Sequence, residues 1–196
     1  METTNLTAPQ FAAALREISA CQGALEWSAG MDYNTAWNTC QNPRWLLFLL
    51  DAVAPLTAIN NERLVCAFAR EVLHLTTDPR VLACIETREA WANGTATRQE
   101  RAAAIAAVRE AADSDVKSPA IFAAKAAGNF YPNDAARIAA WDAIGSAARV
   151  RQWDDTEAAR GQSALIASHA ARVRQCAIIR QLIPQPALSY APALQS

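Results

Sequence analysis

The sequence has little glycine, and it shows no alternation typical of strands. Only six glycines occur among 196 residues, and Val and Ile are scattered. A half-buried strand needs an apolar residue at every second position, so this pattern argues against a sheet. Alanine is abundant instead, with 46 residues. Because alanine loses no side-chain entropy in a helix, the composition predicts an all-α protein.

Long apolar runs are also missing. No window reaches the ~18 apolar residues that a membrane-spanning helix needs. The first ten residues, METTNLTAPQ, contain neither a basic residue nor an apolar stretch, so they do not resemble a signal peptide. We therefore expect a cytoplasmic protein with no membrane partner.

Residues that bind metals are scarce and badly spaced for that purpose. The two histidines, His74 and His169, are far apart and have no ligand-spaced neighbours, so we expect no metal and no cofactor. The cysteines are odd in number and include no CxxC pair, which argues against both a disulfide framework and a zinc site. They are Cys21, Cys40, Cys66, Cys84 and Cys176.

No motif specifies a reaction. The sequence has no glycine-rich phosphate loop and no GxSxG. Cys66 could still meet His74 or His169 in space as a nucleophile pair, but its position between Val65 and Ala67 favours an inert core thiol. We expect no enzyme, and a spatially assembled Cys/His site stays the alternative.

Two carboxylate pairs keep an acid–base variant of that alternative open. Asp154 and Asp155 are adjacent, and Glu86 and Glu89 lie three apart on one expected helix. General acid–base catalysis needs two carboxylates in different environments that face a cleft. The simpler interpretation is a charged helix N-terminus for the first pair and a solvated helix face for the second.

The positions of helix-capping and helix-breaking residues predict about eight to ten helices, packed as a bundle or a short array of helical hairpins. Residues 1–183 form one domain and residues 184–196 an extended or disordered tail. Each expected start is marked by a capping box, by a capping Asn, Asp, Ser or Thr, or by a proline in the first turn. They are Thr7 with Gln10, Asn34, Asn42-Pro43, Asn61, Asp78-Pro79, Thr97 with Glu100, Ser118-Pro119, Pro132 and Thr156.

Residues 45–50 are all large and apolar, between Arg44 and Asp51. An apolar residue on every side of a helix implies burial by neighbours all round. We therefore expect Trp45, Leu46, Leu49 and Leu50 to be nearly inaccessible in a central core helix.

The second half of the chain is arginine-rich. Sixteen of the eighteen basic residues are arginine, and residues 117–196 hold nine basic and five acidic groups, a net +4. The last helix also carries apolar residues at spacings of 4, 3 and 4, namely Ile166, Ala170, Val173 and Ala177. A total net charge of −1 disfavours a nucleic-acid partner.

A charged face across the last two helices is the candidate site for a protein partner with an acidic surface. Its residues are Arg149, Arg151, Asp154, Asp155, Arg172 and Arg174. The simpler interpretation, which the sequence alone favours, is pairing within the chain, in which Arg149, Arg151, Arg172, Arg174 and Arg180 bind Asp142, Asp154, Asp155 and Glu157.

The order of cysteines and tryptophans carries a family resemblance over about residues 11–183. The chain has, in order, Cys21, Trp27, Ala36-Trp37, Cys40, Trp45-Leu46-Leu47, Val65-Cys66-Ala67, Trp91 and Gln175-Cys176-Ala177. This order resembles the all-α immunity proteins of bacterial polymorphic toxin systems that are numbered family five, and it is similar to many phage and prophage proteins. Phe48 and Phe68 depart from it, standing where such sequences often have a second Trp and another Cys.

The resemblance implies a non-catalytic inhibitor that neutralises a toxin by direct binding in the bacterial cytoplasm. The alternative is a phage-encoded inhibitor of a bacterial defence system, an anti-CRISPR or similar anti-defence protein acting in the host cell. Neither the partner nor the oligomeric state follows from the sequence, and a homodimer is compatible with it.

Overall fold

The protein is all-α, as its composition predicts. The computed structural model describes residues 5–53, 56–112, 124–128 and 157–186, and in these ranges it has nine helices and no strands. Their bounds are α1 Ala8–Glu17, α2 Gln22–Trp27, α3 Tyr33–Thr39, α4 Pro43–Val53, α5 Ala58–Val72, the 3-10 helix η1 Leu73–Leu75, α6 Pro79–Ala92, α7 Arg98–Ala112 and α10 Glu157–Leu182.

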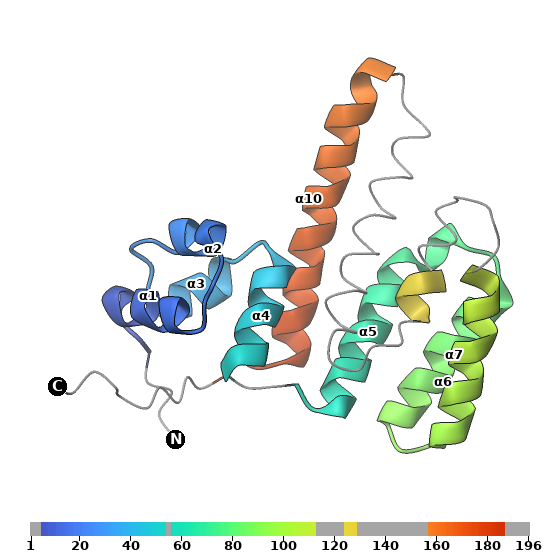
Figure 1. Cartoon of the computed structure of the whole chain (residues 1–196). Coiled ribbons are helices and arrows are strands. Elements are labelled where there is room, and N and C mark those ends of the chain that lie inside the picture. The colour runs from blue at the N-terminus through green and yellow to red at the C-terminus, as the bar shows by residue number, and fades with distance from the viewer. Residues whose placement is uncertain (1–4, 54–55, 113–123, 129–156, 187–196) are drawn as a thin grey trace.

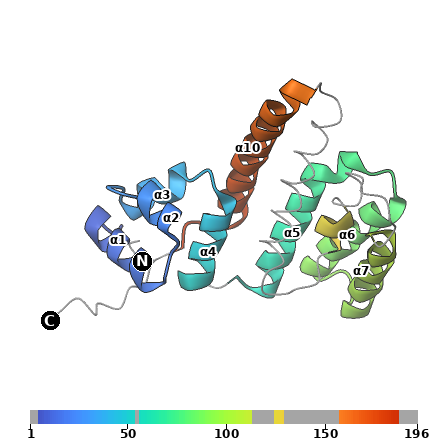
Figure 2. The same cartoon turned by 45° about the horizontal axis from the view of Figure 1, so that its top comes forward.

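The long helix α10 lies in the middle of the helix array. It packs against α4 on one side and α5 on the other, while α6 and α7 follow α5 (Figure 1). Helices α1 to α3 lie on the far side of α4, an arrangement that persists in the turned view of Figure 2. In both views the N-terminal turns of α10 extend beyond α4 and α5.

Two clusters of buried apolar side chains make up the described core, and α5 contributes to both. Leu64, Val65 and Phe68 of α5 join the first cluster with side chains from α1, α3, α4 and α10. Cys66 and Ala69 of the same helix join the second cluster with α6, α7 and residues 124–127. Both sides of α5 are therefore covered, and the two clusters share one wall.

Several expected helix starts are confirmed by their hydrogen bonds. The N–H of Thr7 donates to Gln10 Oε1 at 3.0 Å, which is part of the predicted capping box. The second box forms between Thr97 and Glu100, whose N–H donates to Thr97 Oγ1 at 3.1 Å. Asp78 accepts from the N–H of Arg80 ahead of α6.

Two expected starts are wrong by a few residues. Asp32, not Asn34, caps α3, because Asp32 Oδ1 accepts from the N–H of Thr35 at 2.6 Å. Thr57, not Asn61, caps α5, with its Oγ1 accepting from the N–H of Asn60 at 3.1 Å. In each case several good capping residues lie close together, and propensity alone does not choose between them.

The core assignment of α4 is confirmed for its leucines and wrong for its tryptophan. Leu46, Leu49 and Leu50 are buried, at 2%, 6% and 0% exposure. Trp45 and Phe48 are only half-buried. Helices α1 to α3 and α10 therefore leave one edge of α4 partly open.

Other expectations fall wholly or partly outside the described residues. They concern the start at Ser118-Pro119, the helix after Pro132 and the tail beyond residue 186. Within the described part, residues 124–127 are helical before Gly128, and Tyr33 Oη donates to the carbonyl of Pro186 at 3.0 Å. None of the described helices is long and apolar enough to cross a membrane.

Candidate binding surface

The exposed apolar side chains of the described residues gather on α10. Five large ones are exposed: Ile59 at 45%, Leu82 at 39%, Leu165 at 68%, Ile166 at 60% and Val173 at 38%. Three of these five lie within the nine residues from Leu165 to Val173, in the part of α10 that leads beyond the bundle (Figure 1). Ile166 and Val173 are seven residues apart and therefore lie on one face of the helix. Exposed apolar side chains that are grouped in this way mark interaction sites more often than scattered single residues do.

The apolar stripe predicted for the last helix faces solvent rather than the core. Ile166, Val173 and Ala177 are exposed, and Ala170 is half-buried. The helix buries other residues, Ala171, Gln175, Cys176 and Ile179. These residues make the contacts of α10 with the core. The outward stripe has no covering partner among the described helices.

Two of the candidate partner-binding residues lie on this segment, and the structure places them differently. Arg172 is half-buried and Arg174 is exposed. Arg174 Nε lies 2.5 Å from Glu71 Oε2 of α5, with the arginine side chain 52% exposed. An exposed ion pair of this kind stabilises by only about 0–1 kcal/mol, so both groups stay accessible to a partner.

Pairing within the chain is therefore observed for Arg174, but its partner is not one of the acids that were expected. Arg174 binds Glu71, which was not among the expected partners. Arg180 binds no carboxylate in the described contacts; its Nε donates to the carbonyl of Trp37 at 2.8 Å and its Nη2 to that of Cys40. Arg149, Arg151, Asp154 and Asp155 lie outside the described residues, so their role stays a prediction.

The groups considered for catalysis differ in burial or are bound to other side chains. Cys66 is buried, and burial raises the pKa of its thiol to about 12, whereas His74 and His169 are exposed. Glu89 forms a bidentate ion pair with Arg70, in which both N–O distances are 2.6 Å. In the part of the chain that the structure describes, no three potential ligands gather as a metal site would require.

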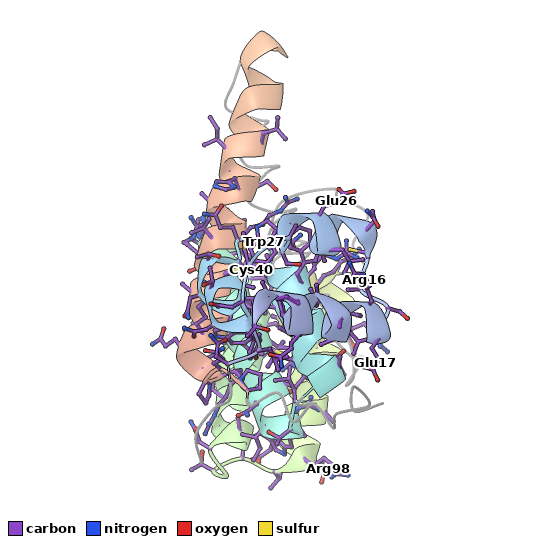
Figure 3. The ribbon with its side chains drawn as sticks, turned by 90° about the vertical axis from the view of Figure 1, so that its left-hand side faces the viewer. Arg16, Glu17, Glu26, Trp27, Cys40 and Arg98 are labelled. Atoms are coloured by element: carbon purple, nitrogen blue, oxygen red, sulfur yellow. The ribbon has the colours of Figure 1, made fainter. Side chains whose placement is uncertain are left out.

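A small aromatic pocket lies between α1, α2, α3 and α4. The rings of Trp27 and Trp45 are 5.4 Å apart and tilted by 42°. Of its thirteen lining residues only Ser28 has a hydroxyl, which donates to the carbonyl of Leu25. Figure 3 labels two others, Trp27 on α2 and Cys40 at the end of α3. A lining without charged groups suits an apolar guest and offers little chemistry.

A buried charge cluster, which was not predicted from the sequence, lies between α5, α6 and α7. Arg88 is 0% exposed and Glu62 3%. Arg88 Nε donates to Glu62 Oε1 at 2.7 Å, and Arg101 Nε donates to the same oxygen at 2.6 Å. Arg88 Nη1 also donates to the carbonyl of Ala127, and the Arg101 guanidinium lies 4.9 Å from the Trp91 ring centre. One carboxylate thus holds two arginines and ties three helices together.

The hydrogen bonds of this cluster decide the protonation state of Glu62. Burial acts to raise the pKa of its carboxyl, but the bonds from Arg101 and Arg88 outweigh burial and lower it. A signal for the cluster did exist in the sequence: Arg88 lies among Val81, Cys84, Ile85 and Ala92, the buried face of α6. A charged residue on an apolar face needs a partner, although the sequence does not say which one.

Comparisons with known proteins add no relative: no family model, no curated protein and no solved structure matches the chain. The resemblance to immunity proteins therefore stays a prediction from the order of the Cys and Trp residues.

Proposed function

We propose that this protein is a non-catalytic inhibitor that neutralises a partner protein by direct binding, in the manner of an immunity protein. The observation that carries the proposal is the concentration of Leu165, Ile166 and Val173 on α10, beside Arg172 and Arg174. We call these five residues the α10 patch.

The composition of the α10 patch suits a protein partner. Protein interfaces bury an apolar centre and surround it with a polar rim in which arginine is enriched. Arg172 and Arg174 would favour a partner with an acidic surface through complementary charge. The Arg174–Glu71 pair is exposed, so Arg174 can exchange Glu71 for a partner carboxylate at little cost.

Inhibition of a bacterial defence system is the second candidate. The resemblance of the order of Cys and Trp residues to that of phage proteins supports it, as does the arginine-rich second half of the chain, and the same α10 patch would serve. Gene neighbourhood separates the two: a toxin gene next to this one supports the immunity function, and a phage early-gene cluster supports the anti-defence function.

The direct test is co-expression with each neighbouring gene product. The proposal predicts a stable complex on co-purification and rescue of cells from the toxic product. Failure to bind or rescue with every neighbour, together with no rescue of phage plaquing on defence-positive hosts, would reject both candidates. Light scattering on the isolated chain shows whether the α10 patch instead pairs two copies, because the mass would then be doubled.

A further inference from the structure

The α10 patch lies where α10 begins to project from the bundle. Arg174 binds Glu71 near the C-terminal end of α5, and this contact marks the level at which α10 meets the end of that helix. Leu165 and Ile166 precede Arg174 by nine and eight residues, which is about 12–14 Å further along a helix. The N-terminal turns of α10 continue past α4 and α5 in both views (Figures 1 and 2). Within the described part of the chain, a partner therefore meets the convex surface of one helix.

The apolar and basic side chains of the α10 patch point in different directions. A helix turns by about 100° per residue, so Arg172 and Arg174 point to opposite sides of Val173. Ile166 lies on the same line as Val173, and Leu165 lies seven residues before Arg172 and so shares its flank. Val173 and Arg174 are exposed, and Arg172 is half-buried. The patch is thus an apolar ridge with an arginine on each flank.

The charge of α10 is of one sign. Between Ala158 and Leu182 the helix has four arginines and one histidine but no acidic residue. Glu71 of α5 pairs with Arg174 and still leaves that side chain 52% exposed. A helix of one sign attracts a surface of the other sign and repels a second copy of itself. Charge complementarity therefore favours an acidic partner over a second α10.

We propose that α10 inserts into an apolar groove of the partner protein, and that acidic residues line both rims of this groove. Ile166 and Val173 would face its floor, and Arg172 and Arg174 its opposite rims. In helix-in-groove recognition, apolar residues at positions i, i+3, i+4 and i+7 anchor the helix. Ile166, Ala170 and Val173 occupy positions i, i+4 and i+7. This mode of binding rests on the proposed inhibitory function and adds to it the shape and charge of the partner's surface.

The test measures how fast thiols placed around α10 are alkylated in the full chain with Cys21→Ser. That change removes the exposed cysteine, and the other four cysteines are buried. Leu165→Cys, Ile166→Cys and Arg174→Cys sample one flank, the ridge and the other flank. Each variant is treated with iodoacetamide, alone and saturated with the neighbouring gene product that co-purifies. We expect all three thiols to react roughly tenfold more slowly or less in the complex, because the packed centre of an interface excludes solvent.

The control is Leu82→Cys on α6, which should react equally fast with and without the partner. Protection of Ile166→Cys without protection of both flanking positions would mean that the partner presents a flat surface. That result overturns the groove and leaves the inhibitory function intact. Equal reactivity of all three thiols in a complex that still forms overturns α10 as the contact.

Two further outcomes are distinguishable. If no neighbouring product binds or rescues, the proposed function fails, and the groove fails with it. Full protection without the partner, by phosphatidylglycerol vesicles or in the concentrated isolated chain, would assign the α10 patch to a lipid surface or to a second copy. Either result overturns the proposal.

The acidic rims have a test of their own in the salt dependence of affinity. Salt screens complementary charges at a rim, so the Kd for the same partner should rise as sodium chloride is added. Arg172→Gln combined with Arg174→Gln should weaken this dependence. Arg80→Gln, which also removes an exposed ion pair with an acid, should leave it unchanged. An affinity that does not depend on salt would overturn the acidic rims.

Discussion

Glu62 is the residue on which the second half of the described core depends. Its carboxylate accepts hydrogen bonds from both Arg88 and Arg101, so its removal would leave two cations without their anion, one of them fully buried. Breaking a buried ion pair by removing one partner costs about 3–5 kcal/mol. We therefore expect Glu62→Gln to lower the free energy of unfolding by about this amount, as measured by urea denaturation.

The matched control for that variant is Glu71→Gln, on the same helix. Glu71 also pairs with an arginine, but its side chain is 28% exposed and that of Arg174 is 52% exposed. The expected loss is therefore only about 0–1 kcal/mol. Equal losses for the two variants would contradict a structural role for the buried cluster.

The lowered pKa of Glu62 also predicts how stability depends on pH. An unfolded Glu has a pKa of about 4.3, so the folded protein holds its proton less tightly than the unfolded chain. The stabilisation is complete above that pH and is lost as the pH falls through the lower, folded pKa. Urea midpoints from pH 7 to pH 3 should fall more steeply for the wild type than for Glu62→Gln, and parallel curves would show that Glu62 does not cause the dependence.

Single residues differ in how far the sequence reveals them. The inert, buried state of Cys66 follows from its apolar neighbours, and the structure agrees. The partners of Arg88 do not follow, because Glu62 and Arg101 lie 26 and 13 positions away along the chain, on two other helices. Trp45 was misjudged because its sequence neighbours are apolar, whereas its exposure depends on how α1 to α3 pack.

At the scale of helices, the sequence determines their number and class better than their starts. The start of α5 is a case that mutation can test. Thr57 Oγ1 accepts from the N–H of Asn60, so Thr57→Ala should lower stability by about 1 kcal/mol. Thr57→Ser, which keeps the hydroxyl, should lose much less stability, as measured by thermal unfolding of both variants. Equal losses would show that the Thr57 hydroxyl does not cap α5.

Helix α10 shows a different limit of sequence patterns. Its 4-3-4 apolar spacing is real, but the stripe faces solvent, and Ala171, Cys176 and Ile179 face the core instead. An alanine-rich helix offers more than one face that is small and apolar enough to pack. Spacing therefore finds an apolar face, while the shape of the neighbouring helices decides which face is buried.

For the whole molecule, the shared wall formed by α5 predicts one cooperative unfolding transition. Phe68 of α5 is 0% exposed and lies in the first cluster, while Ala69 beside it lies in the second. Phe68→Ala should cost about 3–5 kcal/mol and shift tryptophan fluorescence and far-UV circular dichroism transitions together. Two separate transitions would show that the clusters are independent units.

The central claim is that the α10 patch binds a protein partner. It is tested most directly by titrating that partner, once co-purified, with Ile166→Asp and with the matched control Leu82→Asp. Both residues are exposed, at 60% and 39%, so neither change disturbs the core. Leu82 lies on α6, away from the α10 patch, and therefore serves as the control. The account predicts at least a tenfold loss of affinity, about 1.4 kcal/mol, for Ile166→Asp and wild-type affinity for Leu82→Asp. Equal affinity of the two variants would contradict it.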